Sequence, residues 1–168
     1  ISEELTGEVV NRPANLASIL HLAICSSLCN DSSLSYNGRT NSFDKIGEST
    51  EVALRVLAEK VGLPGFDDMP RTLTYLSLQD RATHCATYWR GQFERTFTLE
   101  FDRDRKMMSV ISKRKGQSIL FTKGSPEAVL LRCTQVLTNS KGIAEPITTR
   151  LRDALTKKYQ TYARESLR

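Results

Sequence analysis

Two kinds of hydrophobic periodicity divide this chain into helices and strands. Apolar residues that recur every three or four positions predict amphipathic helices, whereas strict alternation predicts strands. Helical spacing covers residues 13–29, 50–61, 78–89, 126–133 and 147–164 or beyond. Pro13 and Pro126 occupy the first helical position that proline favours, and Gly62 with Pro64 ends the second helix. Five helices are therefore expected.

Alternation begins after the third helix and predicts three strands. The first strand should place one set of residues on a common face: Phe93, Arg95, Phe97, Leu99 and Phe101. The period-two run Met108, Val110 and Ser112 predicts a second strand, and residues 118–123 predict a third. Earlier in the chain, Asn37-Gly38 between short runs containing Tyr36 and Phe43 predicts a hairpin. The Gly-, Pro- and Asp-rich residues 62–71 predict a loop.

This mixture of helices and antiparallel hairpins predicts the α+β class. We expect one domain over residues 1–168, with a single, mainly antiparallel, twisted sheet flanked by helices. Its length, with 39% hydrophobic and 26% charged residues, is typical of one globular domain. Neither end carries a start or stop signal, so we expect an excised segment of a longer protein, monomeric on its own.

Neither a membrane span nor a secretory leader is expected. The longest apolar stretch, Leu16 to Leu28, is interrupted by polar residues and falls short of the ~20 residues that cross a bilayer. The first ten residues carry acids at positions 3, 4 and 8, where a leader would be basic and then apolar. A cytosolic, soluble segment is the expectation.

The reactive residue types predict neither a metal site nor a catalytic site. The four cysteines include no CxxC pair, and Cys25 and Cys29 with His21 share a helix face rather than a zinc-ligand pattern. Reduced, packing cysteines are expected in a cytosolic chain. No GxSxG motif occurs, and His21 and His84 both lie in helical stripes, so a histidine-based triad is disfavoured.

Both common phosphate-binding loops are absent. A P-loop requires Gly-Lys followed by Ser or Thr, and this chain has no Gly-Lys pair. None of its nine glycines are spaced Gly-x-Gly, which excludes the dinucleotide fingerprint. The net charge of +5 nevertheless favours a polyanionic partner, either phosphates or nucleic acid. The basic residues gather in residues 103–123 and near the C-terminal end, where solvated hairpin and helix faces would explain them equally well.

Three well-separated phrases are notable: KIGESTE at residues 45–51, FTLEFDRDRKMMSV at 97–110 and KGSPE at 123–127. Together they resemble the nucleotide-binding (N) domain of P-type calcium-transporting ATPases of the sarco/endoplasmic-reticulum type. The segment from Lys45 to Glu51, KIGESTE, is similar to the family's KxGExTE. The segment from Phe97 to Val110, FTLEFDRDRKMMSV, is similar to FTLEFSRDRKSMSV. The segment from Lys123 to Glu127, KGSPE, resembles KGAPE. The phrases Cys29-Asn30-Asp31 and Glu165-Ser166-Leu167-Arg168, the latter like the family's DTLR, extend the likeness over nearly the whole chain.

The resemblance implies an ATP pocket. Phe101 would stack on the adenine, Glu51 and Thr50 would lie near the base, and Lys106 and Lys123 would line the pocket. Arg103 and Arg168 would point toward the phosphates, and Gly124 would let the ligand approach the backbone. Magnesium would travel on the nucleotide without a protein site.

The chemistry of these residue types agrees with that assignment, although each has a structural alternative. An aromatic face supplies stacking of roughly 1–3 kcal/mol to a base, but the spacing of Phe101 alone favours a core residue. A carboxylate such as Glu51 accepts a hydrogen bond from the adenine amino group, but it is also a favourable acid at a helix start. Arginine forks suit phosphate oxygens, and lysines act as point charges.

For the longer protein, the resemblance implies ATP-driven calcium transport at the cytosolic face of the endoplasmic or sarcoplasmic reticulum membrane. Its partners would be ATP and the phosphorylation and actuator domains of the same chain. Asp44-Lys45-Ile46-Gly47 only echoes the DKTG of the phosphorylated loop, since Ile46 replaces the threonine, so this segment should bind ATP without hydrolysing it. The alternatives are an N domain for another cation and a basic nucleic-acid-binding domain, which a steep salt dependence would reveal.

Overall fold

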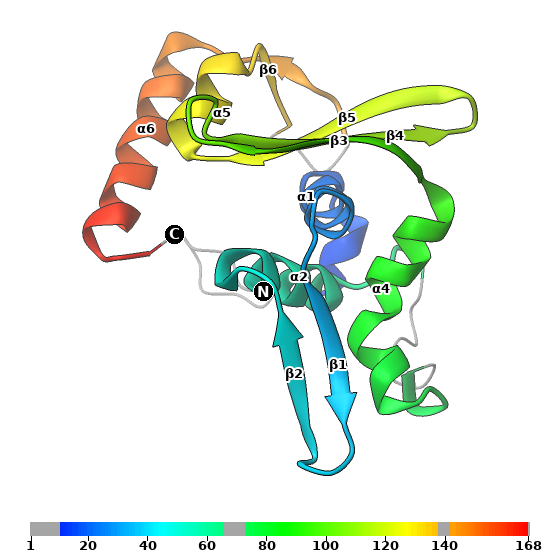
Figure 1. The fold of residues 1–168 in the computed structure, drawn as a ribbon. Coiled ribbons are helices and arrows are strands. Elements are labelled where there is room, and N and C mark those ends of the chain that lie inside the picture. The colour runs from blue at the N-terminus through cyan, green and yellow to red at the C-terminus, as the bar shows by residue number, and fades with distance from the viewer. Residues whose placement is uncertain (1–10, 66–72, 138–141, 168) are drawn as a thin grey trace.

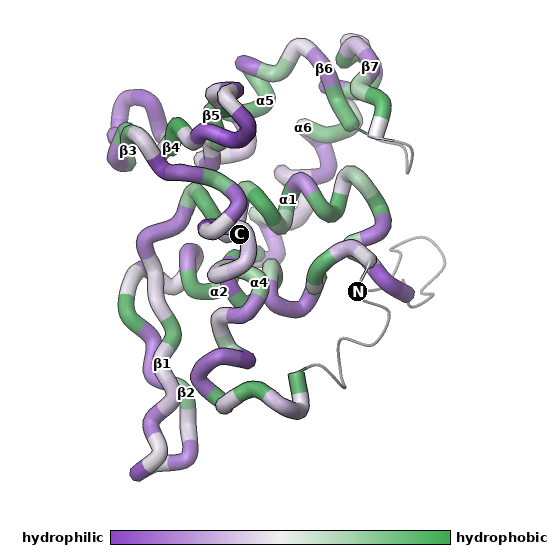
Figure 2. The backbone as a smooth tube through the Cα atoms, turned by 90° about the vertical axis from the view of Figure 1, so that its right-hand side faces the viewer, coloured by the Kyte–Doolittle hydropathy of each residue, from purple (hydrophilic) through white to green (hydrophobic). Residues whose placement is uncertain are grey.

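A computed structural model describes residues 11–65, 73–137 and 142–167 of the chain. The expected features of residues 1–10, most of the predicted loop at 62–71, and Arg168 lie outside the described residues. Within the described part, helices and antiparallel hairpins alternate as an α+β domain. α1 lies between the layer formed by β3, β4 and β5 and the layer formed by α2 and α4, as Figures 1 and 2 show from two directions.

The five predicted helices are present. A 3-10 turn, Pro13–Asn15, precedes α1 (Ala17–Leu28). α2 covers Ser49–Val61, α4 covers Leu78–Gln92, α5 covers Pro126–Arg132 and α6 covers Thr149–Arg164. Side-chain caps fix three of the starting points, because Ser77, Ser125 and Thr148 accept the amide protons of Asp80, Ala128 and Leu151.

The predicted hairpins form two of the sheets. β1 (Ser33–Asn37) pairs with β2 (Ser42–Ile46) around the Asn37-Gly38 turn. β3 (Glu94–Asp102), β4 (Met107–Arg114) and β5 (Gln117–Gly124) form an antiparallel meander with β4 in the centre. The central position of β4 explains why, of these three strands, only β4 has a long run of buried residues, from Met107 to Val110.

Two details of the predicted sheet differ. Instead of one sheet there are three among the described residues, because β6 (Gln135–Val136) and β7 (Glu145–Pro146) pair separately and were not predicted. Phe93 does not share a face with Phe97 and Phe101: it is the C-cap of α4 and 4% exposed, whereas they are exposed. The register of β3 also shifts between Arg95 and Phe97 and between Leu99 and Asp102, so simple alternation fails there.

The core lies on both sides of α1. Ile24 and Leu28 pack with Leu63, Trp89 and Phe93, and Cys29 packs against the sheet at Met108 and Val110. Ala23 faces α2, where it clusters with Ala14, Ala58 and Val61. Figure 2 shows hydrophobic colouring over much of α1. A helix that is covered on both sides must be apolar around most of its circumference, and most residues of α1 are apolar.

No helix in the three described ranges combines the length and the apolar character that a bilayer crossing requires.

Candidate functional site at the end of the three-stranded sheet

The sheet register gathers five of the predicted site residues at one end of the meander. β3 ends at Asp102, which pairs with Met107 at the start of β4, and Met107 pairs in turn with Gly124 at the end of β5. Lys123 is the next residue along, opposite Met108. Phe101, Arg103 and Lys106 lie in or beside the β3–β4 turn at this same end. We call this end of the meander the turn end.

Phe101 presents an exposed ring at the turn end. It is 62% exposed, which excludes the core role that its spacing also allowed. Exposure does not single it out, because Phe97 on the same strand is 56% exposed. What distinguishes Phe101 is its place beside the charged residues of the turn end, whereas Phe97 lies farther back, opposite Ile111.

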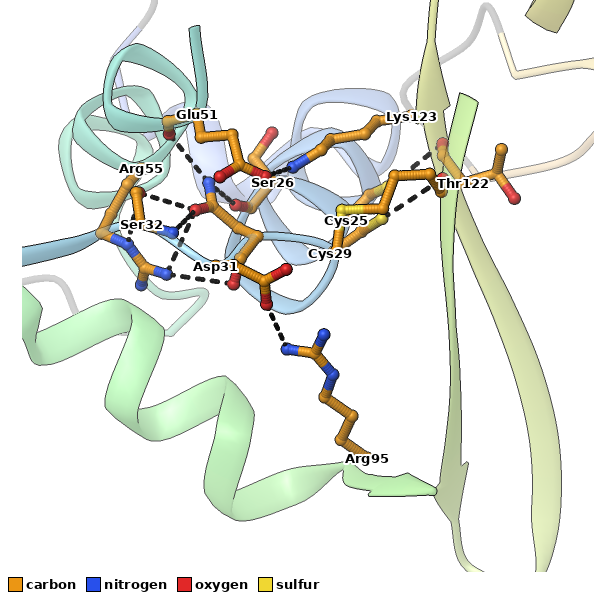
Figure 3. A network of polar contacts seen from close by, with 12 residues as sticks. Cys25, Ser26, Cys29, Asp31, Ser32, Glu51, Arg55, Arg95, Thr122 and Lys123 are labelled. Atoms are coloured by element: carbon orange, nitrogen blue, oxygen red, sulfur yellow. Dashed lines mark hydrogen bonds and ion pairs between the residues drawn. The ribbon is translucent and has the colours of Figure 1, made fainter. Parts of the chain in front are cut away.

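Glu51 joins the turn end through an ion pair with Lys123. The Lys123 Nζ donates to Glu51 Oε1, so the first turn of α2 meets the last residues of β5 (Figure 3). The side chain of Glu51 is 17% exposed and that of Lys123 is 20% exposed, so solvent screens this pair less than a surface pair. Thr50, the preceding residue, is exposed at the start of the same helix. Residues 72 positions apart in sequence are thereby brought into contact.

The basic residues of the β3–β4 turn have different environments. Lys106 Nζ lies 3.5 Å from Glu127 Oε1, and both side chains are at least half exposed. Arg103 is exposed. Arg105 is hydrogen-bonded to the backbone, since its guanidinium donates to the carbonyls of Glu100 at 2.8 Å and Met107 at 3.1 Å. Only Lys106 and Arg103 of this turn are therefore suited to meeting an anion.

Glu127 lies in the first turn of α5, directly beside the turn end. Hydrogen bonds from its own backbone amide and from Ser125 lower the pKa of its carboxyl, and Lys106 adds to the effect. Glu127 is therefore a fixed negative charge beside Lys106 at neutral pH.

Gly124 has a structural reason to be glycine. An added Cβ would lie 2.4 Å from the carbonyl oxygen of Lys106 and 2.4 Å from Cγ of Met107, closer than real Cβ contacts. The amide of Ser125 also donates to that same Lys106 carbonyl, at 3.0 Å. The absence of a side chain at 124 therefore lets β5 close against the β3–β4 turn, independently of any ligand.

A buried polar network, which sequence reasoning missed, lies behind Glu51. It consists of Asn30, Ser32 and Arg55, which are 0%, 1% and 2% exposed. Figure 3 shows Ser32 and Arg55 on the far side of Glu51 from Lys123. Gly47 packs directly on it, since an added Cβ would lie 2.9 Å from Cα of Ser32. The only sequence feature that pointed to this network was the Cys29-Asn30-Asp31 phrase, and that phrase by itself indicates no structural role.

The four cysteines are free thiols, and Cys25, Cys29 and Cys85 lie in or against the core. Cys25 and Cys29 donate weakly to the carbonyls of Thr122 and Met108, both at 3.6 Å. Burial raises the pKa of Cys25 to about 11, with a further contribution from Cys29. Burial likewise raises the pKa values of Cys29 and Cys85. Among the described residues, no group of three His, Cys, Asp or Glu side chains is placed to hold a metal ion.

A cavity of about 240 Å³ lies elsewhere, against α4. It is lined by Leu76, Asp80, Thr83, His84, Thr87 and Tyr88. None of the predicted site residues contributes to it.

Comparison with known proteins identifies the family of this chain. Residues 18–168 match the family described as P-type ATPase, cytoplasmic domain N. The chain is 51% identical over 162 residues to a protein of Arabidopsis thaliana named calcium-transporting ATPase 3, endoplasmic reticulum-type. That alignment covers 96% of this chain and 16% of the Arabidopsis protein, so the chain spans a small part of its relative. On this match and identity, the chain belongs to the family of P-type ATPase cytoplasmic N domains.

Proposed function

We propose that this domain binds ATP at the turn end of the sheet. The observation that carries the proposal is the sheet register, which brings the exposed Phe101, the Glu51–Lys123 pair and the basic β3–β4 turn to the same end of the meander. An adenine needs a flat apolar face and a few placed polar groups, whereas its triphosphate needs cations exposed to solvent, as Arg103 and Lys106 are. These residue types supply both requirements.

Each residue has a specific role in the proposal. The ring of Phe101 stacks on the purine. The Glu51 carboxylate accepts a hydrogen bond from the adenine amino group, and Lys123 remains beside it as a donor to ring nitrogens. Arg103 and Lys106 meet phosphate oxygens, and Thr50 lies at the edge of the pocket. Arg168 is proposed for the phosphates on the family resemblance alone. Mg²⁺ accompanies the phosphates.

In the longer protein, the domain would deliver ATP to a phosphorylated aspartate in another domain of the same chain. The relative's name supports calcium as the transported ion and the endoplasmic reticulum as the membrane. An N domain that serves another cation is the alternative, because an ATP pocket does not contact the transported ion. ATP, the phosphorylation domain and the actuator domain are the proposed partners.

Binding should be weak in the isolated domain. One stacked ring and a few solvated charges, without a partner domain to close over them, leave little beyond the ~4 kcal/mol that corresponds to millimolar dissociation. The experiment must therefore detect millimolar binding, which NMR chemical-shift titration does.

We would titrate the labelled domain with ATP and then GTP, and repeat both with Phe101→Ala and Glu51→Ala. Phe97→Ala is the matched control, because it removes a similarly exposed ring from the same strand away from the turn end. Saturable shifts around Phe101, Glu51 and Lys123, stronger for ATP and lost only in Phe101→Ala, are expected. Absence of saturation at several millimolar ATP would contradict the proposal.

The nucleic-acid alternative is tested in the same series. A single-stranded oligonucleotide that binds with a steep salt dependence, and that ATP cannot displace, would favour that alternative.

A further inference from the structure

The position of Glu51 is set from behind by the side chain of Asn30. Asn30 follows the C-cap of α1, and its Nδ2 donates to the backbone carbonyl of Glu51 at 2.8 Å and to that of Ser26 at 3.0 Å. One buried amide thus ties the last turn of α1 to the first turn of α2. Because Glu51 lies in the first turn of α2, its own amide has no hydrogen-bond partner within the helix.

The remaining half of the Asn30 amide is satisfied as well. Its Oδ1 accepts the Ser32 amide at 2.9 Å and the Ser32 hydroxyl at 2.6 Å, and the Arg55 guanidinium lies at 3.4 Å. Two carbonyls face the nitrogen and several donors face the oxygen, so the amide has one favourable orientation. A fully satisfied buried network of this kind fixes a single geometry.

Arg55 closes the network from α2 itself. It lies one helical turn after Glu51, and its guanidinium donates to Ser32 Oγ at 3.3 Å and to the Asn30 carbonyl at 3.5 Å. Arg90 of α4 reaches the same carbonyl at 3.4 Å. Within the described part of the chain Arg55 forms no ion pair at 4.0 Å or less, so its direct partners are neutral oxygens. Desolvation by burial lowers the pKa of Arg55, and the nearby charges of Glu59, Glu51 and Asp31 offset only part of that cost. An arrangement with that desolvation cost is a poor way to obtain stability alone.

We propose that Asn30 and Arg55 are positioning residues that hold the Glu51 carboxylate where it selects adenine. The proposal rests on the proposed function, in which Glu51 accepts the adenine amino group. Lys123 attracts the Glu51 side chain from the front, and Asn30 holds its backbone from behind. Loss of the rear contact lets the first turn of α2 move with Lys123, and the carboxylate then meets the base less well.

If Asn30 and Arg55 only stabilised the core, their variants would affect nucleotide binding differently. A variant that merely destabilises the domain reduces the folded fraction for every nucleotide equally. A variant that displaces Glu51 changes the discrimination between bases. The sharpest probe is inosine triphosphate, because a carbonyl oxygen replaces the amino group at position 6 and would face the carboxylate unfavourably. The quantity to measure is the ratio of the inosine triphosphate and ATP dissociation constants in the folded domain.

Asn30→Asp is the most informative variant. It keeps an acceptor for Ser32 and Arg55 but turns the donor toward Glu51 into a second oxygen. Arg55→Met removes the guanidinium and keeps an unbranched apolar stem. Glu51→Ala gives the ratio of the two dissociation constants that is expected when no carboxylate contacts the base. Leu63→Ala is the matched control, because Leu63 is 4% exposed, lies beyond the other end of α2 and belongs to the core cluster of Trp89 and Phe93.

Asn30→Asp and Arg55→Met should lower the ratio several-fold toward that of Glu51→Ala, while Leu63→Ala keeps the wild-type ratio. Amide hydrogen exchange provides a second readout that needs no nucleotide. The Val52 amide, which donates to the Glu48 carbonyl at 3.0 Å, should exchange faster in Asn30→Asp, whereas the Gly62 amide at the far end of α2 should not. If Asn30→Asp does not fold, Ser32→Ala replaces it with the same expectations.

A wild-type ratio in folded Asn30→Asp and Arg55→Met, or in Ser32→Ala if that variant is needed, would overturn the inference and leave the proposed function intact. Equal affinity of the wild-type domain for the two nucleotides would overturn both the base-reading role of Glu51 and the inference. No saturable binding of either nucleotide would reject the proposed function itself.

Discussion

The backbone of Gly124 lies against Lys106 so closely that a Cβ at position 124 would be 2.4 Å from the Lys106 carbonyl oxygen. This contact closes the turn end, because Gly124 terminates β5 and Lys106 terminates the β3–β4 turn. Both residues were assigned to a ligand pocket on resemblance, yet the contact between them is needed before any ligand arrives.

Gly124→Ala should destabilise the domain by about 1–3 kcal/mol, because the neighbouring backbone must shift to admit the methyl group. Urea unfolding measures this loss. Gly91→Ala is the control: Gly91 is exposed in α4 and its Cβ would meet nothing within 4 Å, so the variant should be neutral or more stable by about 0.5–1 kcal/mol. Equal stability of Gly124→Ala and wild type would contradict the contact.

The Glu51–Lys123 pair should show measurable coupling. Both side chains are about four-fifths covered, so their attraction is less screened than that of a surface pair. A double-mutant cycle with Glu51→Gln and Lys123→Met should give a coupling free energy of about 1 kcal/mol in urea unfolding. The more exposed Lys106–Glu127 pair is the comparison and should give less. Additive effects at Glu51 and Lys123 would mean that the pair does not form in solution.

Three of the cysteines should resist alkylation in the folded domain. With the pKa of Cys25 raised to about 11, only about one thiol in a thousand is ionised at pH 8, and Cys29 and Cys85 are buried. Iodoacetamide followed by mass spectrometry should therefore modify Cys133 first, and all four should react in urea. Rapid modification of native Cys25 at pH 8 would contradict this.

The same shift has a defined sign for stability. Folding favours the neutral thiol of Cys25, so its contribution is fully present below the ordinary pKa of 9.0 and is lost as pH rises toward about 11. Urea unfolding between these pH values should show a shallower decline in Cys25→Ala than in wild type, with the slopes compared rather than the absolute stabilities.

Glu127 should contribute to stability at neutral pH and lose that contribution in acid. Its pKa is lowered from 4.5 in the folded state, so the carboxylate favours folding above that value and its contribution disappears as pH falls through the lower, folded pKa. The melting temperature of Glu127→Gln should therefore lie below wild type at pH 7 and converge with it near pH 3. Because the side chain is exposed, the difference should be small; a constant difference across this pH range would exclude the mechanism.

Local pattern was enough to predict most of the elements. The five helices and both main hairpins follow from apolar spacing, proline placement and Asn37-Gly38, because these are interactions within a few residues. The pattern failed where pairing is nonlocal. The short strands β6 and β7 have no period of their own, and the register shifts of β3 depend on how β4 lies beside it.

Three separated phrases of the sequence were enough to predict the family and the residue types of the candidate site, and the pattern of helices and hairpins predicted the fold class. Which of the site residues meet one another depends on the tertiary structure. It exposed Phe101, joined Glu51 to Lys123, and committed Arg105 to backbone carbonyls. It also placed Asn30 and Arg55 behind Glu51. The reason is physical: burial and partner choice arise when α1 packs between the sheet and the other helices, and no local period records that packing.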